Sequence, residues 1–264
     1  LEKINTAKGY IAKGDVYQLC LTTQLVGEYQ GDELSYFLRL RKTNPAPYAA
    51  FIRVATKTYV SISPERFMAI DSLVVTSSPI KGTRPRSEDP EVDAQLATEL
   101  SESEKEQAEN LMIVDLVRND LSVICEPETI VVTDLLRVRS YSTVHQLVSD
   151  VSGKLRPGVS TEAAIAALFP GGSMTGAPKI RAMEIINELE SADRLGYSGA
   201  IGFISGNGNL DLGMVIRTAC FDQGRVTIGI GGGITSDSDP ETEHQEIQIK
   251  AQAHVSALSA AVRW

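Results

Sequence analysis

Short runs of β-branched and aromatic residues recur along this chain, each bounded by turn residues such as Gly, Pro, Asn and Asp. Such runs are typical of β-strands. The segment Asp222-Gln223-Gly224 separates two of them and predicts a hairpin turn. We expect a further strand, Ser198–Ile204, to pair beside that hairpin. The other predicted strands are Val16–Thr23, Tyr48–Val54, Thr58–Ser63, Arg66–Thr76, Thr129–Val138, Val144–Leu155, Leu210–Phe221 and Arg225–Ile230.

Helical periodicity and helix-end signals predict the helices. Asp239-Pro240 is typical of a helix start, and Pro178 falls in a first turn, where proline is tolerated. Because the strands come in hairpin runs rather than alternating strictly with helices, we expect an α+β domain with a large, mostly antiparallel sheet. The predicted helices are Leu1–Lys13, Pro90–Asn119, Thr161–Phe169, Thr175–Glu190 and one from Asp239-Pro240 nearly to Trp264.

Composition narrows the possible functions. The chain has 264 residues, 42% of them hydrophobic, so a sizeable core can be buried. The net charge of -9 argues against a nucleic-acid surface, and an anionic substrate would need a local cluster of cations or a metal. No apolar run reaches the ~20 residues of a membrane span, and no secretory leader is visible. Cys20, Cys125 and Cys220 are far apart, which suits reduced thiols in a cytoplasmic protein.

Two pairs of glutamates have the spacing that places both members on one helix face. Glu106 and Glu109 are three residues apart, as are Glu243 and Glu246, and Lys250 follows Glu246 by four. If the two faces met, they could hold a hard divalent cation, and Mg²⁺ suits such a site because it takes few carboxylates. The same spacing is also typical of solvated helix faces.

Two glycine-rich segments could let the backbone approach a ligand closely. Gly171–Lys179 lies at a predicted helix N-terminus, which attracts anions, but it lacks the P-loop signature. Gly229–Gly233 lacks the dinucleotide fingerprint. A carboxylate ligand therefore fits better than a nucleotide, and Arg217 could grip it with two hydrogen bonds. The alternatives are a bend or bulge at a strand end and a salt bridge at a sheet edge.

One lysine and one acid are candidates for catalysis. Lys81 lies in Ser78–Arg86, which we interpret as a loop, and it can be a nucleophile only if its amine is neutral. Positive charge from Arg84, Arg86 or a bound cation would favour the neutral amine. Glu65 could be a general acid that protonates a departing hydroxyl. The alternatives are an ordinary surface lysine and an ion pair between Glu65 and a cation.

Read together and in order, these segments resemble the chorismate-utilising enzymes, a family that includes anthranilate, aminodeoxychorismate, isochorismate and salicylate synthases. The resemblance covers nearly the whole chain. It rests on Gly14–Gln18, Ser63–Glu65, Pro79–Arg84, Ala108–Leu116, Arg118–Asp120, Pro170–Lys179, Ser198–Gly202, Ile216–Thr218 and Asp239–Lys250.

The resemblance implies a fold and a set of site residues. The fold is the chorismate-binding, aminodeoxychorismate synthase-like fold, an αββα sandwich of large, mostly antiparallel β-sheets covered by helices. Mg²⁺ would be held by Glu109 and Glu246, supported by Glu106 and Glu243. Glu65 would be the acid that helps the ring hydroxyl leave. The implied contacts to the substrate are Gln18, His145, Thr175, Gly176, Lys179, Tyr197, Arg217, Gly231, Gly232, Gly233 and Lys250.

Lys81 selects a branch within the family. Anthranilate and isochorismate synthases usually carry Ala at this position, and aminodeoxychorismate synthases carry Lys. Gln18 agrees, because members that add water usually place a lysine there. The implied reaction is amination of chorismate to 4-amino-4-deoxychorismate, a precursor of p-aminobenzoate and folate. Ammonia would come from a glutamine amidotransferase on another chain or domain.

Two departures and two alternatives remain. The family's histidine usually lies one residue later than His145, so either His145 or Gln146 could face the substrate. Family members are also longer at the N-terminus, so we expect residues 1–264 to be the catalytic domain without that segment. The alternatives are anthranilate synthase component I and a chorismate-binding module without turnover, with no nucleic-acid or membrane partner in any of these cases.

Overall fold

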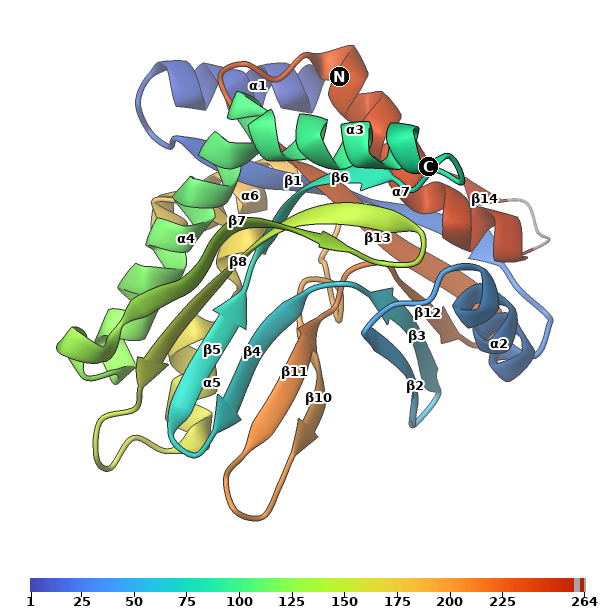
Figure 1. Ribbon diagram of the computed structural model, residues 1–264. Coiled ribbons are helices and arrows are strands. Elements are labelled where there is room, and N and C mark those ends of the chain that lie inside the picture. Colours follow the sequence, from blue (N-terminus) through green and yellow to red (C-terminus); the bar gives the residue numbers. More distant parts are fainter. Residues whose placement is uncertain (259–261, 264) are drawn as a thin grey trace. The chain divides into compact units, whose positions relative to one another are not determined.

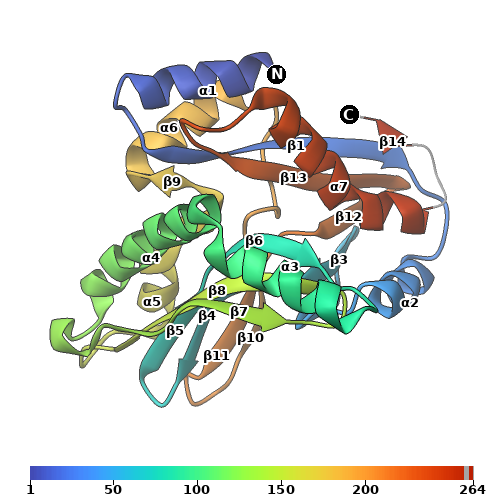
Figure 2. The same ribbon diagram turned by 45° about the horizontal axis from the view of Figure 1, so that its top comes forward.

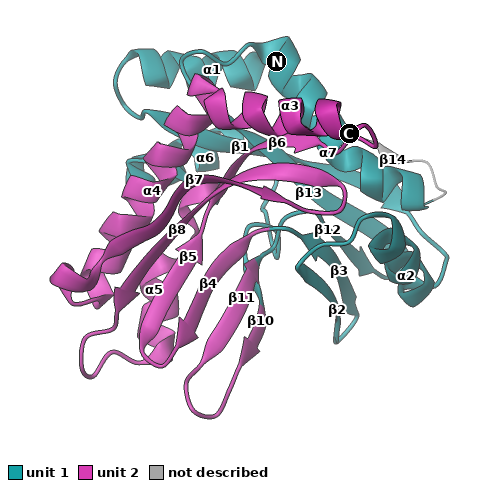
Figure 3. Cartoon of the chain, viewed as in Figure 1, with its two compact units in different colours: residues 1–64, 174–201, 214–264 teal, residues 65–173, 202–213 magenta. Residues whose placement is uncertain are grey.

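The computed structural model describes residues 1–258 and 262–263, and the chain divides into two compact units (Figure 3). Unit 1 comprises residues 1–64, 174–201 and 214–264, and unit 2 comprises residues 65–173 and 202–213. Neither unit is a continuous stretch of chain. Each contains one sheet, and we describe each unit by itself.

Sheet 1 belongs to unit 1 and has the strand order β14-β1-β13-β12-β3-β2, with the short β9 also paired to β1 (Figure 1). All its pairings are antiparallel, and the longest joins β1 to β13. Its strands are β1 (Gln18–Glu28), β2 (Tyr48–Val54), β3 (Lys57–Ser63), β9 (Gly176–Ala177), β12 (Thr218–Asp222), β13 (Arg225–Ile234) and β14 (Val262–Arg263).

Four helices pack on one face of sheet 1 (Figure 2). Alternate strand residues such as Leu25, Val60 and Ile228 point to this face, where Tyr36 and Leu258 meet them in the core. A second cluster packs helices α1 and α6 against Leu19 and Ile234. The helices are α1 (Glu2–Ala12), α2 (Glu33–Thr43), α6 (Lys179–Leu189) and α7 (Pro240–Leu258).

Unit 2 is built on sheet 2, with the strand order β10-β11-β4-β5-β8-β6 and β7 paired to β8. Helices α3 and α4 pack against β6 and β8. The strands are β4 (Arg66–Asp71), β5 (Val74–Ser78), β6 (Ile80–Pro85), β7 (Val131–Ser140), β8 (Val144–Lys154), β10 (Ala200–Ile204) and β11 (Leu210–Met214). The helices are α3 (Pro90–Glu102), α4 (Glu104–Ile124) and α5 (Thr161–Leu168), with single 3₁₀ turns at Pro127–Thr129 and Gly172–Met174.

Elements with strong local signals are confirmed. The strand Tyr48–Val54 has the predicted bounds, and the turn at 222–224 joins β12 to β13. Asp239 accepts a hydrogen bond from the Thr242 backbone N–H at 2.9 Å, so it caps α7 as predicted. Antiparallel pairing and covering helices match the predicted fold class. The predicted end of the last helix falls partly outside the described residues, because α7 is described to Leu258 and β14 follows at Val262.

Several predicted elements are wrong because a break inside them was missed. The run Arg66–Thr76 is the hairpin β4–β5, which turns at Ser72 and Leu73, both with positive φ. The helix Pro90–Asn119 is two helices, because Ser103 takes an extended conformation and caps α4. The strand Leu210–Phe221 divides between the two sheets. The predicted strand Ser198–Ile204 pairs with the first half of it, β11, as expected.

Other segments were assigned to the wrong type or missed. The helix predicted from Thr175 begins only at Lys179, because Gly176 and Ala177 pair with β1. The predicted loop at Ser78–Arg86 contains strand β6. Helix α2 was not predicted. Over residues 1–258 and 262–263, no helix combines the length and apolar character needed to cross a membrane.

A buried histidine makes the stability of unit 1 sensitive to pH. His254 on α7 is 1% exposed, its Nδ1 lies 2.6 Å from the Tyr36 hydroxyl, and burial lowers its pKa from 6.5 to about 4. Between these values the unfolded chain binds the proton and the folded chain does not, so stability falls as pH drops from 6.5 towards 4. The full loss is about 3 kcal/mol from the difference in pKa.

Urea unfolding between pH 7.5 and 4 measures this loss. We expect His254→Leu to flatten the pH dependence by about that amount. An equally steep pH dependence in His254→Leu would exclude His254 as its source.

Candidate active site

Lys81 lies on a bulged strand that directs it towards helix α4. The register of β6 against β8 shifts between Ile80 and Thr83, and Gly82 has a φ of +85°. A Cβ at Gly82 would lie 2.8 Å from Leu100 Cδ1, so glycine is required there by both conformation and space. The Lys81 Nζ lies 3.4 Å from Glu109 Oε2, and both side chains are nearly buried. The bulge therefore places the amine beside a carboxylate.

The carboxylates of α4 are surrounded by cations of the same unit. Glu109 is also approached by the Lys105 Nζ at 3.9 Å, and the Arg84 Nη1 lies 3.7 Å from Glu106. The carboxylates on this face of α4 are therefore partly buried and paired with cations, and they are not exposed to solvent on all sides. The interpretation of Glu106 and Glu109 as an ordinary solvated helix face does not fit this arrangement.

The two arginines near Lys81 are engaged by carboxylates. The Arg84 Nε lies 2.9 Å from Glu99, and Arg86 makes two hydrogen bonds of 2.8 Å with Asp93. Hydrogen bonds from Arg86 are the main cause that holds the pKa of Asp93 below its usual range. Their positive charge is therefore largely balanced, and the sequence-based expectation that they favour a neutral Lys81 is not supported by these contacts.

Glu65 lies between β3 and β4 and is buried, with 5% exposure. Burial raises its pKa from 4.5 to about 7, whereas a hydrogen bond from Ser173 and the charge of Lys81 act in the opposite direction. The Ser173 Oγ donates to Glu65 Oε1 at 2.6 Å. A carboxyl group that is substantially protonated near neutral pH is suited to donate a proton. The role of Glu65 as a general acid stays a prediction.

His145 and Gln146 are neighbours on β8 with different surroundings. The His145 Nε2 lies 3.0 Å from Asp93 and its Nδ1 lies 2.9 Å from the Ser140 Oγ, so protein groups occupy both ring nitrogens. Gln146 is equally buried, and its Oε1 has no hydrogen-bond partner among the described residues. The geometry favours Gln146 over His145 for a substrate contact. The role of His145 here is to tie β7 and β8 to α3.

In unit 1, the structure brings Lys250 together with the glycines of β13. The Lys250 Nζ donates to the Gly231 carbonyl at 3.1 Å and lies 2.5 Å from Glu246 Oε1. Glu243 is 4% exposed and accepts a hydrogen bond from the Ser238 Oγ at 2.7 Å. Residues 231–233 lie in a regular strand paired with β1, not in a loop. A Cβ at Gly231 would lie 2.5 Å from the Leu21 carbonyl oxygen, so this position needs glycine.

The loop before α6 is held against β1. A Cβ at Gly176 would lie 2.2 Å from the Gln18 carbonyl oxygen, and the Thr175 carbonyl accepts from the Cys20 N–H at 2.7 Å. The Gln18 side chain is buried, and its Oε1 is without a hydrogen-bond partner in the described part of the chain. Backbone pairing therefore brings the loop at Thr175 and Gly176 close to Gln18 in unit 1. Lys179 begins α6.

Arg194 supports this loop and was missed by the sequence analysis. It donates to the carbonyls of Met174 and Cys20 at 2.5 and 2.8 Å and pairs with Glu190 at 2.7 Å. Glu190 in turn accepts from the N–H and hydroxyl of Thr22. These contacts link β1, α6 and the loop at residues 174–177. Only the four-residue spacing of Glu190 and Arg194 signals the pair in the sequence.

Arg217 lies at the start of β12 with a left-handed backbone, φ +46°. Burial lowers the pKa of Arg217, while the nearby Tyr197 raises it. The Tyr197 ring in turn covers Gly229, where a Cβ would lie 2.3 Å from the ring. Arg217 and Tyr197 are thus close together in unit 1. Their contact with a substrate stays a prediction.

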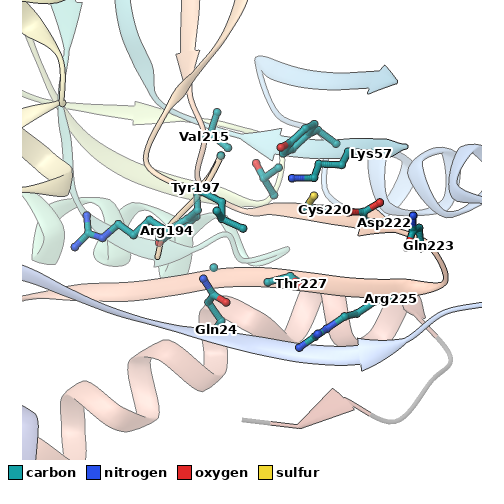
Figure 4. Close-up of a pocket in the computed structure, with 15 residues that line it drawn as sticks. Gln24, Lys57, Arg194, Tyr197, Val215, Cys220, Asp222, Gln223, Arg225 and Thr227 are labelled. Atoms are coloured by element: carbon teal, nitrogen blue, oxygen red, sulfur yellow. The ribbon is translucent and has the colours of Figure 1, made fainter. Parts of the chain in front are cut away.

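A cavity of about 460 Å³ opens on sheet 1 beside Tyr197 (Figure 4). Lys57, Cys220 and Asp222 also line it, from β3 and β12. Of the predicted substrate contacts, the cavity wall includes Tyr197 alone. It is therefore not the site predicted from the sequence.

The four glutamates predicted to bind metal belong to different units, with Glu106 and Glu109 in unit 2 and Glu243 and Glu246 in unit 1. Among residues 1–258 and 262–263, no three His, Cys, Asp or Glu side chains are gathered in a way that could hold a metal ion. Each helix supplies one pair of carboxylates. One pair provides only some of the oxygen ligands in the octahedral coordination of Mg²⁺. Metal binding stays a prediction.

Known proteins resemble this chain in sequence. It is 47% identical over 259 residues to a probable aminodeoxychorismate synthase, chloroplastic, of Oryza sativa subsp. japonica, covering 96% of this chain and 29% of that protein. It is 43% identical over 245 residues to aminodeoxychorismate synthase component 1 of Escherichia coli K12, covering 93% and 54%. The chain thus spans between about a third and about half of the length of these relatives.

The fold is also known. The crystal structure of anthranilate synthase component I from Streptococcus pneumoniae TIGR4 matches with a TM-score of 0.88 and 37% identity, over 96% of this chain and 56% of that one. This match confirms the predicted fold. The family model described as chorismate binding enzyme matches residues 1–256. With that match over nearly its whole length, the chain belongs to the family of chorismate binding enzymes.

Proposed function

We propose that this chain is the catalytic part of an aminodeoxychorismate synthase component I, which converts chorismate and ammonia to 4-amino-4-deoxychorismate. The observation that carries the proposal is the position of Lys81 on the β6 bulge, 3.4 Å from Glu109, in a unit that also holds the buried acid Glu65. Relatives with this activity in their names are 43–47% identical over nearly the whole chain. The activity belongs to longer proteins, so it stays a proposal for this chain.

The chemistry follows from these two side chains. The neutral amine of Lys81 adds to ring C2, both ring double bonds shift by one position, and the C4 hydroxyl leaves as water with a proton from Glu65. Ammonia then attacks C4, the two double bonds return, and the lysine leaves C2 as a neutral amine. Glu65 ends the first step as a carboxylate and recovers its proton from the ammonium group formed at C4. Its pKa of about 7 suits a group that must both give and regain a proton near neutral pH.

Chorismate carries two carboxylates, and unit 1 offers the groups to bind them. We propose that Arg217 and Lys250 supply the positive charge, with Tyr197 beside Arg217 and the backbone of 231–233 beside Lys250. Gln18 in unit 1 and Gln146 in unit 2 each hold a buried amide oxygen without a partner in the described residues. Such oxygens are costly unless a ligand satisfies them, which supports a role in binding the ring hydroxyl or an amine.

Mg²⁺ is the cofactor we propose. Glu109 and Glu246 would be its ligands, supported by Glu106 and Glu243. When bound, the ion neutralises substrate and protein carboxylates. Lys81 and Lys105 lie beside Glu109, and Lys250 lies beside Glu246. Positive charge next to these carboxylates supports the proposal. The proposal predicts that the lysines change partners when the ion binds.

We also propose a partner that supplies ammonia. Several relatives are named component 1, which implies a second component. A glutamine amidotransferase is the class of enzyme that releases ammonia from glutamine, so it is the partner we expect. Because two of the plant relatives are named chloroplastic, the predicted cytoplasmic location stays a prediction.

One assay tests the function. The purified chain is incubated with chorismate, MgCl₂ and an ammonium salt, and the products are separated by chromatography. We expect 4-amino-4-deoxychorismate, which an aminodeoxychorismate lyase added afterwards converts to p-aminobenzoate. Binding of chorismate without any product, in the chain and in a version extended to the length of its relatives, would favour the binding-module alternative.

A second candidate activity is anthranilate synthesis. The chain is 40% identical over 261 residues to anthranilate synthase component 1 of Methanothermobacter thermautotrophicus. The two activities differ in product, and anthranilate is detected directly by its fluorescence. Anthranilate as the main product would make Lys81 an incidental replacement and overturn the proposal.

A further inference from the structure

Ser173 is held in a fixed position next to the proposed acid. It lies in the 3₁₀ turn Gly172–Met174, where a Cβ at Gly172 would come within 2.8 Å of Leu116 Cδ2 of α4. Before the turn, the Phe169 ring meets the Phe67 ring of β4 edge to face, with centroids 6.3 Å apart. Contacts on both sides therefore restrict where the Ser173 hydroxyl can lie.

The hydroxyl makes a short hydrogen bond with a buried carboxyl group. The Ser173 Oγ donates to Glu65 Oε1 at 2.6 Å, and Glu65 is 5% exposed. Such short bonds are typical when the acceptor carries charge. A serine hydroxyl can also accept a hydrogen bond, so it stays a partner of the carboxyl group in both protonation states. A group that must give and regain a proton without turning away needs such a partner.

We propose that Ser173 is a positioning residue for the proton-transfer step, and that its hydroxyl holds the carboxyl group of Glu65 in the orientation from which it protonates the departing hydroxyl. The inference rests on the proposed function, because it needs Glu65 to be the acid. Ser173 itself is not expected to touch a reacting atom. It acts through Glu65 alone.

The surroundings of Glu65 give the sign of the expected effect. Burial raises the pKa of Glu65 most, and the Ser173 hydrogen bond and the charge of Lys81 lower it. Removing the hydroxyl removes one of the two groups that favour the carboxylate, so the acid should stay protonated to higher pH. An acid needed in its protonated form sets the alkaline side of the profile of kcat/KM against pH. That side should therefore move to higher pH in Ser173→Ala.

The experiment compares Ser173→Ala, Ser173→Thr and Ser122→Ala in the ammonium-dependent assay. Ser122 is an exposed serine of α4 whose hydroxyl donates to the Asn119 carbonyl of its own helix. For Ser173→Ala we expect kcat to fall on the order of 10-fold. This is a part of the rate acceleration that a correctly positioned general acid provides. We expect the alkaline limb of this variant's profile of kcat/KM against pH to move to higher pH by about one unit. A shift of this size corresponds to the loss of one hydrogen bond to a charged acceptor. Ser173→Thr should keep the wild-type limb, and Ser122→Ala should match wild type throughout.

A direct measurement does not depend on turnover. The infrared C=O band of the protonated Glu65 carboxyl, assigned by its loss in Glu65→Gln, can be followed against pH in each variant. We expect the band to persist to higher pH in Ser173→Ala than in wild type or Ser173→Thr. If the band and the alkaline limb both stay where they are in wild type, the inference is overturned, even if Ser173→Ala has lost activity.

The outcomes separate the inference from the proposed function. If Glu65→Gln loses activity and the limb of Ser173→Ala does not move, only the role of Ser173 fails. If Glu65→Gln keeps full activity, Glu65 is not the acid, and both the inference and the proposed acid step fail. A Ser173→Ala limb that moves to lower pH would also contradict the inference, because the hydrogen bond would then favour the protonated acid.

Discussion

Replacing Lys81 with alanine is expected to lower kcat/KM for 4-amino-4-deoxychorismate formation by at least about 1000-fold, since the variant removes the proposed nucleophile. The Lys105 Nζ approaches the other oxygen of Glu109, Oε1, at 3.9 Å, whereas Lys81 approaches Oε2. The β6 bulge depends on Gly82 and not on Lys81, so the fold should survive the change. Steady-state rates with ammonium as the nitrogen source measure the effect.

Lys81→Arg separates nucleophilicity from charge. Arginine keeps the positive charge beside Glu109 but stays protonated, so it cannot add to the ring. We expect it to be as inactive as Lys81→Ala, whereas Lys154→Ala, at the exposed end of β8, should retain wild-type rates. Incubation of the wild type with chorismate but without ammonium should yield a covalent adduct on Lys81, detected by peptide mass spectrometry. An active Lys81→Arg without any adduct in the wild type would reduce Lys81 to an electrostatic role.

Glu109→Ala and Glu246→Ala are each expected to lower turnover by about 1000-fold, because each would remove a ligand of the proposed Mg²⁺ and leave the negative charge of chorismate uncompensated. Excess chelator should reduce the wild type to a similar level, and added Mg²⁺ should restore it. Calorimetric titration with Mg²⁺ in the presence of chorismate should show weaker binding in both variants. This readout is independent of the chemical step.

Exposed acidic residues on the same helices provide the controls. Asp115 on α4 has a 78% exposed side chain, and Glu241 lies exposed in the first turn of α7. We expect Asp115→Ala and Glu241→Ala to keep wild-type turnover and Mg²⁺ affinity. Glu109→Ala also removes the partner of Lys81, so a rate loss in that variant with unchanged Mg²⁺ binding would point to Lys81 and not to a metal. Full activity in chelator would remove Mg²⁺ from the proposal.

The comparison of sequence and structure shows where local signals suffice. The cap at Asp239, the turn at 222–224 and the strand Tyr48–Val54 were all predicted, because each depends on residues within a few positions of one another. The breaks at Ser72 and Ser103 were missed, although Asp71-Ser72 is typical of a turn and Ser103 precedes Glu106 by three residues, the spacing of a capping box. The division of 210–222 between two sheets depends on which distant strands accept each half.

By itself, the sequence determined the family, the fold class and the candidate residues for chemistry. Motifs and hydrophobic periodicity involve residues close together in the sequence, so they can be identified without a structure. Only the tertiary structure decided the partners of those residues. It placed Lys81 beside Glu109, Ser173 beside Glu65, and Asp93 beside His145. These pairs are separated by 28, 108 and 52 positions. Contacts at such separations arise from how strands and helices pack, which no local pattern encodes.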